Sequence, residues 1–155
     1  MPYFQRARNV ELSIIQSLET NVNADWSGVT IVKGFKNAYV AVLPVVAVYE
    51  QDVSMFRQEI GNTTHRKQFG MVIDIFTTSN AQRIDLADYI SDKIVQGFVF
   101  NTYAHASGDK SQIEASADGR ITFISFTENR KVEITDSTDS HDRFRHTISF
   151  VAEKL

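Results

Sequence analysis

Two runs of apolar residues dominate the pattern of hydrophobic and polar positions along the chain. Residues 43–50 are apolar at nearly every position, and residues 68–76 alternate between apolar and polar side chains. Both runs contain valine, isoleucine and aromatic side chains, which favour a pleated and half-buried surface. The pattern therefore predicts two neighbouring strands of one sheet. Pro44 cannot donate a ladder hydrogen bond, so we expect it at the start or on the edge of its strand.

The segment between the two runs, residues 51–67, is predicted to be a polar loop. It is too polar for a protein core, but it contains the apolar side chains of Val53, Met55, Phe56 and Ile60. A loop surrounded only by water does not need such side chains, and loops often carry them for a partner. Two interpretations remain open, because the loop could instead fold back on its own sheet.

Two segments have the period of amphipathic helices. The first is expected to begin after Asn9 as its cap and to end within residues 21–25, and its apolar stripe comprises Val10, Ile14, Ile15, Leu18 and Val22. The second is expected from Ala81 to about Gln96, after capping residues 77–80 and before Gly97 as the C′ residue. Its apolar stripe comprises Ile84, Ala87, Ile90 (or Ser91), Ile94 and Phe98.

Shorter β-prone runs account for most of the remaining chain. We predict strands at residues 29–33, 99–103, 120–127 and 144–152, with residues 35–42 leading into the first long strand and residues 106–110 forming a turn. Residues 131–135 are either a short strand or an extension, and residues 136–142 are predicted to be a solvated loop. In the long alternating strand that ends at Phe76, Asp74 is expected on a half-buried face.

The last strand alternates between a core face and a face toward water or a neighbour. The first face carries Phe144, His146, Ile148 and Phe150, and the second carries Arg143, Arg145, Thr147 and Ser149. With no regular alternation of strands and helices, the pattern indicates an α+β fold. We expect a single domain over residues 1–155, with an antiparallel or mixed sheet, two helices on one face and long inter-strand loops.

The composition is that of a folded globular protein. The 155 residues are 43% hydrophobic and 23% charged, with a net charge of −3, so no global field attracts nucleic acid or anionic lipid. The absence of cysteine excludes disulfides, thiolate metal sites and cysteine nucleophiles. There is no secretory signal pattern and no apolar run of membrane-spanning length, so we expect a soluble intracellular protein without a membrane partner.

The residue types needed for catalysis are present but not in catalytic spacings. His65, His105, His141 and His146 show no metal-ligand motif, and His146 is expected to be a hydrogen-bonded core residue. Asp136, Asp139 and Asp142 lack the glycine and the glutamate of a calcium loop, so they indicate a solvated acidic turn. Neither a glycine-rich phosphate loop nor a nucleophile elbow occurs. We therefore expect no enzyme activity, no metal and no cofactor.

Four short basic clusters remain, and clusters of this length usually lie on a solvent-exposed face. They are Arg6 with Arg8, residues 65–67, Arg130 with Lys131, and Arg143 with Arg145. None is long enough to bind nucleic acid by itself, so no sequence-specific nucleic-acid binding is expected. On an acidic protein, Arg143 and Arg145 would suit contact with an acidic partner subunit.

The succession of elements resembles a known group of virion proteins. An amphipathic helix leads to Leu-Pro-Val-Val-Ala-Val-Tyr at 43–49, and basic residues open the alternating strand at 66–76. Ile-Asp-Leu-Ala-Asp-Tyr-Ile follows at 84–90, and Arg-His-x-Ile-x-Phe stands near the end of the sequence at 145–150. This order and hydrophobic pattern resemble the tail terminator and head-to-tail joining (neck) proteins of long-tailed bacteriophages, along nearly the whole chain but without a signature motif. The stretch 103–140 is longer than in the smaller members of that family.

The resemblance implies a structural protein and no catalytic residues. Members of that family assemble into a ring, commonly a hexamer, that caps the tail tube and docks to the head, so the partners would be other copies of the chain, the tail tube protein and a connector or stopper protein. DNA can pass through the lumen of such a ring, and the location would be the tail or neck of a virion assembled in the host cytoplasm.

Mapped onto this chain, the resemblance implies that residues 51–67 reach toward the tube or a ring neighbour. Met55 and Phe56 would then be apolar anchors beside Val53, with Arg57 and Glu59 as a polar rim. Other neck components of similar size, a ligand-binding or enzymatic α+β domain, and a monomeric adaptor remain alternatives.

Overall fold

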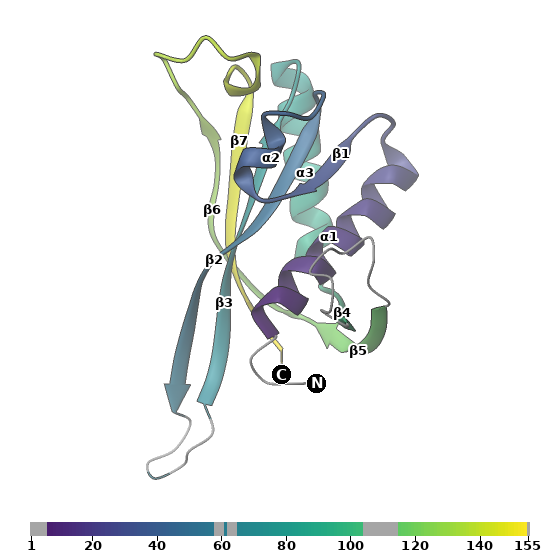
Figure 1. Cartoon of the computed structure of the whole chain (residues 1–155), viewed down its shortest axis with the longest axis vertical. Helices are drawn as coiled ribbons and strands as arrows, with labels where there is room; N and C mark the ends of the chain where they lie inside the picture. Colours follow the sequence, from purple (N-terminus) through teal and green to yellow (C-terminus); the bar gives the residue numbers. More distant parts are fainter. Residues whose placement is uncertain (1–5, 58–60, 62–64, 104–114, 155) are drawn as a thin grey trace.

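The computed structural model describes residues 6–57, 61, 65–103 and 115–154 (Figure 1). In chain order, the helices and strands are α1 (Arg6–Asp25), β1 (Thr30–Lys33), α2 (Phe35–Ala38), β2 (Val45–Arg57), β3 (His65–Phe76), α3 (Asn80–Val95), β4 (Phe98–Tyr103), β5 (Ala115–Ile121), β6 (Phe123–Val132), the 3-10 turn η3 (Ser140–Asp142) and β7 (Arg145–Glu153).

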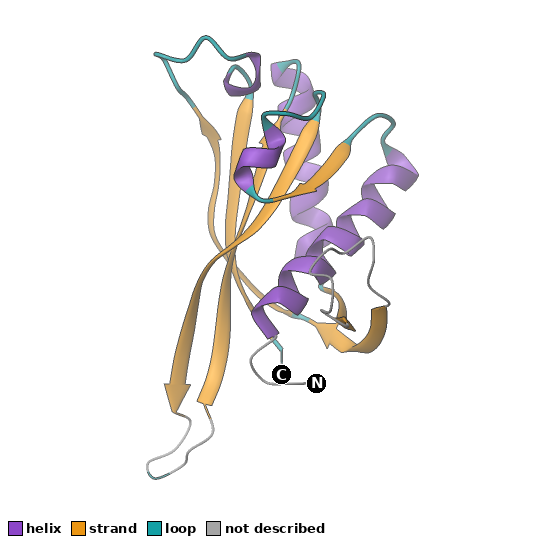
Figure 2. Cartoon of the chain, in the orientation of Figure 1, coloured by secondary structure: helices purple, strands orange, loops and turns teal. Residues whose placement is uncertain are grey.

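Five strands form one mixed sheet in the order β1-β2-β3-β7-β6, and β4 pairs with β5 in a separate two-stranded sheet. Within the large sheet, β1 runs parallel to β2, while β2, β3, β7 and β6 pair antiparallel with their neighbours. The longer helices α1 and α3 lie together on one side of this sheet (Figure 2). The predicted α+β class with a mixed sheet is confirmed.

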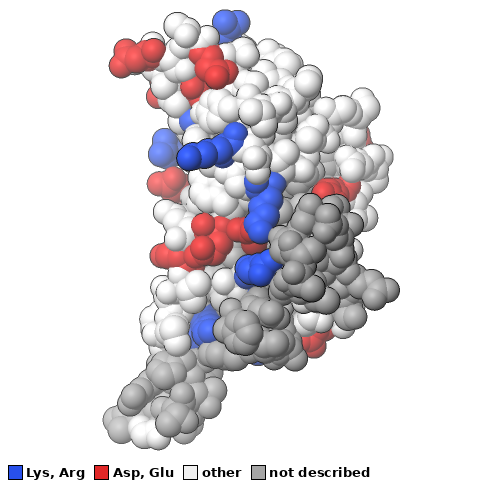
Figure 3. Space-filling model, in the orientation of Figure 1, with Lys and Arg blue, Asp and Glu red and all other residues white. Residues whose placement is uncertain are grey.

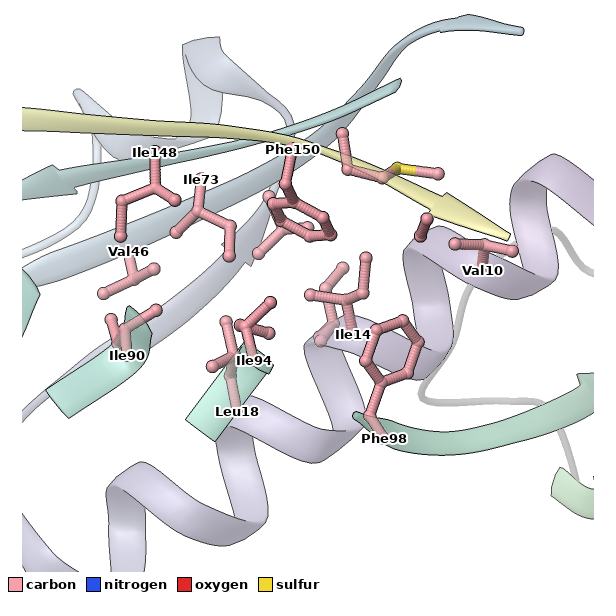
Figure 4. Close-up of a cluster of buried hydrophobic side chains, with 14 of the residues drawn as sticks. Val10, Ile14, Leu18, Val46, Ile73, Ile90, Ile94, Phe98, Ile148 and Phe150 are labelled. Carbon is pink, nitrogen blue, oxygen red and sulfur yellow. The ribbon is translucent and has the colours of Figure 1, made fainter. Parts of the chain in front are cut away.

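The main core lies between the large sheet and the two long helices (Figure 4). Leu18 of α1 and Ile94 of α3 face Ile73 and Phe150 of the sheet, and all four side chains are at most 1% exposed. This placement confirms the predicted core face of the last strand, which also carries the buried Ile148. Burial of such side chains stabilises the fold by roughly 1.5–3 kcal/mol each.

A second, smaller core lies on the opposite face of the sheet. It contains Ala38 of α2 together with Val45, Ala47 and Phe76 of the sheet, all fully buried. Residues 35–42 were predicted to lead into the strand, but the structure folds part of this segment into α2. Because both faces of β2 are covered here, its apolar run is continuous rather than alternating. Pro44, which follows a cis peptide bond, directly precedes β2, as predicted.

The helix ends agree in part with the sequence prediction. Ser79 caps α3 by accepting a hydrogen bond from the Gln82 N–H at 3.1 Å, and Gly97 follows the helix with φ +82°. Helix α1, however, begins at Arg6, so Asn9 is a fully buried residue inside the helix rather than its cap. The tertiary packing of Asn9 overrides the cap preference of its residue type.

The predicted stripe of α3 is wrong at Ile84. This side chain is 48% exposed, and Leu86 is buried in its place, together with Ala87, Ile90 and Ile94. Leucine and isoleucine are both apolar, so periodicity alone allowed either of two overlapping stripes.

Several strand boundaries also differ from the prediction. The predicted strand 120–127 is divided at Thr122, where β5 ends and β6 begins, and residues 131–132 extend β6. The predicted turn at 106–110 lies outside the described residues. The division at Thr122 sends β5 away from the large sheet to pair with β4.

Asp74 was expected on a half-buried face, but its side chain is only 2% exposed. Tyr49 Oη donates a hydrogen bond to Asp74 Oδ2 at 2.8 Å, and Arg145 Nη2 lies 3.6 Å from Asp74 Oδ1. Burial and the hydrogen bond to Asp74 raise the pKa of Tyr49. A buried carboxylate is stable only when it is paired and hydrogen-bonded in this way.

Asp142 belongs to the same network, so the prediction of a wholly solvated acidic turn is wrong at this residue. It accepts hydrogen bonds from Tyr39 Oη at 2.6 Å and Ser137 Oγ at 2.5 Å, while Asp136 and Asp139 are exposed. Burial opposes ionisation of Asp142, but the hydrogen bonds from Ser137 and Tyr39 hold its pKa below the usual value.

Gly97 is expected to tolerate no side chain, because a Cβ there would lie 2.4 Å from the carbonyl oxygen of Ile121 at a φ of +82°. Gly28 is a matched control with φ +74° and no atom within 4 Å of the added Cβ. Gly28→Ala should lower the free energy of unfolding by about 1–2 kcal/mol through backbone strain alone. Gly97→Ala should lower it by more, as measured by urea denaturation, and equal losses would contradict the close contact.

A candidate assembly interface on the β2–β3 arm

The distal halves of β2 and β3 form a two-stranded arm, which we define as residues 51–57 and 65–68. The predicted loop is therefore largely strand: Met55 pairs with Lys67, and Phe56 pairs with Arg66. The arm extends past the helices at one end of the long axis (Figures 1 and 2). The prediction of a loop was wrong because polar residues on a strand exposed on both faces do not produce an apolar alternation.

The arm lacks the neighbours that stabilise the rest of the sheet. Strand β1 pairs with β2 only as far as Val48, and β7 pairs with β3 only as far as Phe69. Beyond these positions the described arm has two strands, and an isolated two-stranded ribbon is marginally stable in water. Its outer edges carry backbone groups available for pairing.

The backbone and side chains are closely packed at the base of the arm. The ladder has a bulge between Glu50 and Asp52, and a Cβ on Gly70 would lie 1.8 Å from Asp52 Oδ1. Glycine is therefore required at position 70 if Asp52 keeps its position. Bulges bend a strand and increase its twist, which directs the arm away from the body.

An ion pair fixes β3 of the arm to the end of β7. The Arg66 guanidinium contacts both carboxylate oxygens of Glu153, at 2.5 and 2.6 Å, and Gln68 donates to Glu153 Oε2 at 3.2 Å. The hydrogen bond from Arg66 lowers the pKa of Glu153 despite its burial. Beside it, burial and the charge of Arg6 lower the pKa of Lys67.

Three apolar side chains of the arm are exposed. Val53 is 39% exposed, Met55 54% and Phe56 48%. By strand alternation Val53 and Met55 share one face and Phe56 lies on the other. The described part of the arm therefore does not fold back on its own sheet, although the side chain of Arg57 and residues Glu59 and Ile60 lie outside the description. Exposed apolar side chains on both faces are typical of a surface that another protein covers.

The remaining interface candidates separate into an exposed and a buried residue. Arg143 is exposed, but Arg145 is 9% exposed in its side chain, and its guanidinium carbon lies 5.0 Å from the Phe35 ring centroid and 4.9 Å from that of Phe76. The hypothesis that Arg145 contacts a partner subunit is therefore corrected, because the fold uses this charge to neutralise Asp74.

Sequence reasoning missed two further exposed apolar residues, Val40 and Val42, which are 85% and 83% exposed. They lie between α2 and β2, where the Ala41 carbonyl contacts His141 Nε2 at 2.8 Å. The only signal in the sequence is the interruption of the apolar run by Pro44, which marks these residues as preceding the strand.

His146 is a hydrogen-bonded core residue, as predicted. Its Nδ1 contacts Arg83 Nη1 at 2.7 Å and its Nε2 contacts Asn129 Oδ1 at 2.5 Å, so the neutral Nε2–H tautomer satisfies both partners. Burial and the charge of Arg83 lower its pKa to about 4. The side chain of His65 and residue His105 lie outside the description.

The described residues contain no group of three or more His, Asp or Glu side chains that could hold a metal ion. A cavity of about 360 Å³ lies between α1, the end of α3 and β4, and Lys93 and Arg120 are its charged lining residues. The other lining side chains are apolar, hydroxyl or amide groups such as Ser13, Gln16 and Asn101. None of the described residues that line this cavity has a carboxylate or imidazole that could accept a proton from a substrate.

Basic and acidic side chains are interspersed on the face that Figure 3 shows, without a continuous basic stripe. Among the described helices, none is long and apolar enough to cross a membrane.

No family model matches the chain, and no curated protein matches it either. Among solved structures, a chain of the structure described as "Virion of native gene transfer agent (GTA) particle" superposes with a TM-score of 0.61. The two chains are 15% identical, and the match covers 97% of each. At this identity the comparison shows a shared fold over essentially the whole chain.

The low pKa of His146 predicts a specific pH dependence. Between the ordinary value of 6.5 and about 4, the unfolded chain binds a proton at this residue that the folded chain does not. Stability should therefore fall as the pH falls through this window. His146→Gln should reduce this loss relative to the wild-type protein, as measured by urea unfolding from pH 7 to 5. Parallel curves for the two proteins would show that His146 is not the group responsible.

Proposed function

We propose that this protein is a structural component of a phage-like virion and has no enzymatic activity. Two observations support this assignment. The whole chain shares its fold with a chain of a gene transfer agent virion particle. In addition, the described chain presents exposed apolar side chains on a projecting arm. A virion protein acts through contacts with other proteins, and the arm is suited to such contacts.

More specifically, the protein acts as a tail terminator or tail completion protein. Copies of the chain form a ring, with six copies as the expected number, that caps the tail tube and joins it to a connector or stopper protein of the head–neck region. The ring belongs to the tail or neck of the virion, is assembled in the host cytoplasm, and leaves a lumen for DNA. This finer assignment rests on the order of elements along the sequence.

The observation that carries the proposal is the exposure of Val53, Met55 and Phe56 on the arm. In the monomer these side chains are only about half buried, whereas full burial of a large apolar side chain contributes roughly 1.5–3 kcal/mol. Assembly therefore gives the arm a stabilising environment that the monomer lacks. Arg143 and Arg57 are candidates for the polar rim of the contact.

Another neck component, such as a stopper or connector adaptor, would use the same arm. The cavity beside β4 favours a different alternative, a small-ligand-binding domain, because it is hollowed to about 360 Å³ and contains Lys93 and Arg120. Cavities of 300–1,000 Å³ are typical of ligand sites, but those sites are usually more apolar. We therefore place assembly first.

The proposal predicts a mass at a multiple of 17.5 kDa for the purified protein, alone or with tail tubes. Replacing both exposed anchors, in Met55→Ser/Phe56→Ser, should remove apolar area from the contact and weaken assembly by at least about tenfold. Light scattering coupled to size exclusion, over a concentration series, measures both quantities.

Val40→Ser/Val42→Ser is a matched control, because it removes two even more exposed apolar side chains at a site away from the arm. This control should assemble as the wild-type protein does. If the arm variant assembles equally well, the arm does not form the contact, and a wild-type protein that stays monomeric even with tail tubes contradicts the ring.

A further inference from the structure

The cavity beside β4 has the size of a small-molecule site. Its volume of about 360 Å³ lies between α1, the end of α3, β4 and β5, and α1 and β4 lie side by side in Figure 1. Clefts of roughly 300–1,000 Å³ are usual for sites that bind small molecules. The volume therefore suits a small ligand at the lower end of this range.

Hydrogen bonds between α1 and β4 fix the buried polar residues that line the cavity. Ser13 is fully buried and Asn101 is 7% exposed, and Ser13 Oγ accepts a hydrogen bond from the Asn101 N–H at 2.9 Å. Gln16 Oε1 accepts hydrogen bonds from Tyr103 Oη at 2.7 Å and from Asn101 Nδ2 at 3.4 Å. These bonds orient the Gln16 amide, and its Nε2 amino group donates to no described residue. The cavity therefore contains a positioned hydrogen-bond donor.

Two cations, Lys93 and Arg120, line the cavity without a counter-ion. Neither forms an ion pair within the described residues. Lys93 Nζ lies 5.4 Å from the centroid of the Tyr89 ring, and Arg120 Nη2 donates to the Gln96 carbonyl oxygen at 3.4 Å. Because both of these partners are neutral, both positive charges remain available to a ligand.

The two cations lie at the same end of α3. Lys93 is in the last turn of the helix, and Gln96, which accepts the bond from Arg120, follows it by three residues, a rise of roughly 4.5 Å along the axis. Three acidic residues are close in sequence to the lining residues but do not line the cavity, namely Glu19, Asp92 and Asp118. Among the described side chains that line the cavity, the only charges are therefore positive.

The donors of the cavity match the acceptors of an anionic oxygen group. Carboxylates and phosphates accept several hydrogen bonds at once, and bonds from lysine or arginine to them are roughly twice as strong as bonds between neutral groups. The other polar lining groups are hydroxyls and amides, as in Ser17, Thr20 and Asn21, which both donate and accept. These groups suit hydroxyl groups on the body of the ligand.

We infer that this cavity binds a small hydroxylated molecule through its carboxylate or phosphate group, with Lys93 and Arg120 as counter-ions and Gln16 as a hydrogen-bond donor. The ligand joins α1, the end of α3 and the β4–β5 pair. This site lies outside the arm, and the inference does not depend on the proposed assembly.

Calorimetric titration of the full chain at constant ionic strength tests the class of ligand, because salt screens exposed charges. Citrate, glucose 6-phosphate or both should bind at one site per chain with a Kd below about 1 mM, and uncharged glucose should bind at least about tenfold more weakly. Binding of citrate alone assigns the site to carboxylates, and binding of glucose 6-phosphate alone assigns it to phosphates. The inference is overturned if neither anion binds at up to about 10 mM.

Removal of the two cations tests where the anion binds. Lys93→Gln/Arg120→Gln should weaken binding of the anion by at least about tenfold, because it removes both counter-ions. Lys36→Gln/Arg130→Gln is the matched control, since it makes the same change in net charge at exposed residues that do not line the cavity. If the two variants bind the anion equally well, the anion is held elsewhere and the inference fails.

Gln16→Glu tests the site with little change in shape. It keeps an oxygen that accepts the bonds from Tyr103 and Asn101, but it replaces the donor by a negative charge that repels the ligand. Binding should again weaken by at least about tenfold, whereas Gln51→Glu, the same change at an exposed residue outside the cavity, should have little effect.

Urea unfolding with and without the anion checks that each variant is folded. A ligand that binds only the native state raises the unfolding midpoint, so the anion should raise it for the wild-type protein and both controls but much less for the cavity variants. A purely structural role, in which Lys93 and Arg120 only compensate the carbonyl end of α3, predicts no shift for any of these proteins. That result would contradict the inference and leave the assembly proposal unchanged.

Discussion

The structure depends on where the backbone of β2 finds hydrogen-bonding partners. Up to Val48 the strand has a neighbour on each side and side chains buried on both faces. Beyond the bulge that follows Glu50, it retains only β3, and its apolar residues Val53, Met55 and Phe56 are exposed. Unpaired strand edges and exposed apolar side chains both favour association with another chain. One strand thus belongs to the core at one end and exposes apolar side chains at the other.

Buried charge is a second feature of the body of the protein. The face of the sheet opposite the long helices holds Asp74, Tyr49 and Arg145 in one network, with Arg145 stacked against Phe35 and Phe76. Removing either member of a buried pair leaves an uncompensated charge, which typically costs 3–5 kcal/mol. The network therefore holds α2 and the ends of β3 and β7 in a fixed arrangement.

The elements with a strong hydrophobic periodicity could be predicted from the sequence. It predicted the α+β class, both long helices, the core face of β7 and a helix cap within residues 77–80, where the structure has Ser79 as the cap. It could not predict β5 or the distal parts of β2 and β3, because strands exposed on both faces lack an alternating pattern. It also could not separate Arg143 from Arg145. Their different surroundings come from Asp74 and Phe35, which are remote in sequence, so only the tertiary fold distinguishes them.

The candidate site shows the same division between local and tertiary information. Apolar residues in a polar segment indicated a surface for a partner, and this signal directed attention to Met55 and Phe56. Helix α3 gave a misleading signal, since Ile84 appeared to belong to the core stripe. Once Leu86 is seen to take the buried position, Ile84 becomes an apolar residue that the monomer does not need on its surface. Periodicity alone cannot decide which of two overlapping apolar stripes packs against the sheet, so only the tertiary fold distinguishes Ile84 from Leu86.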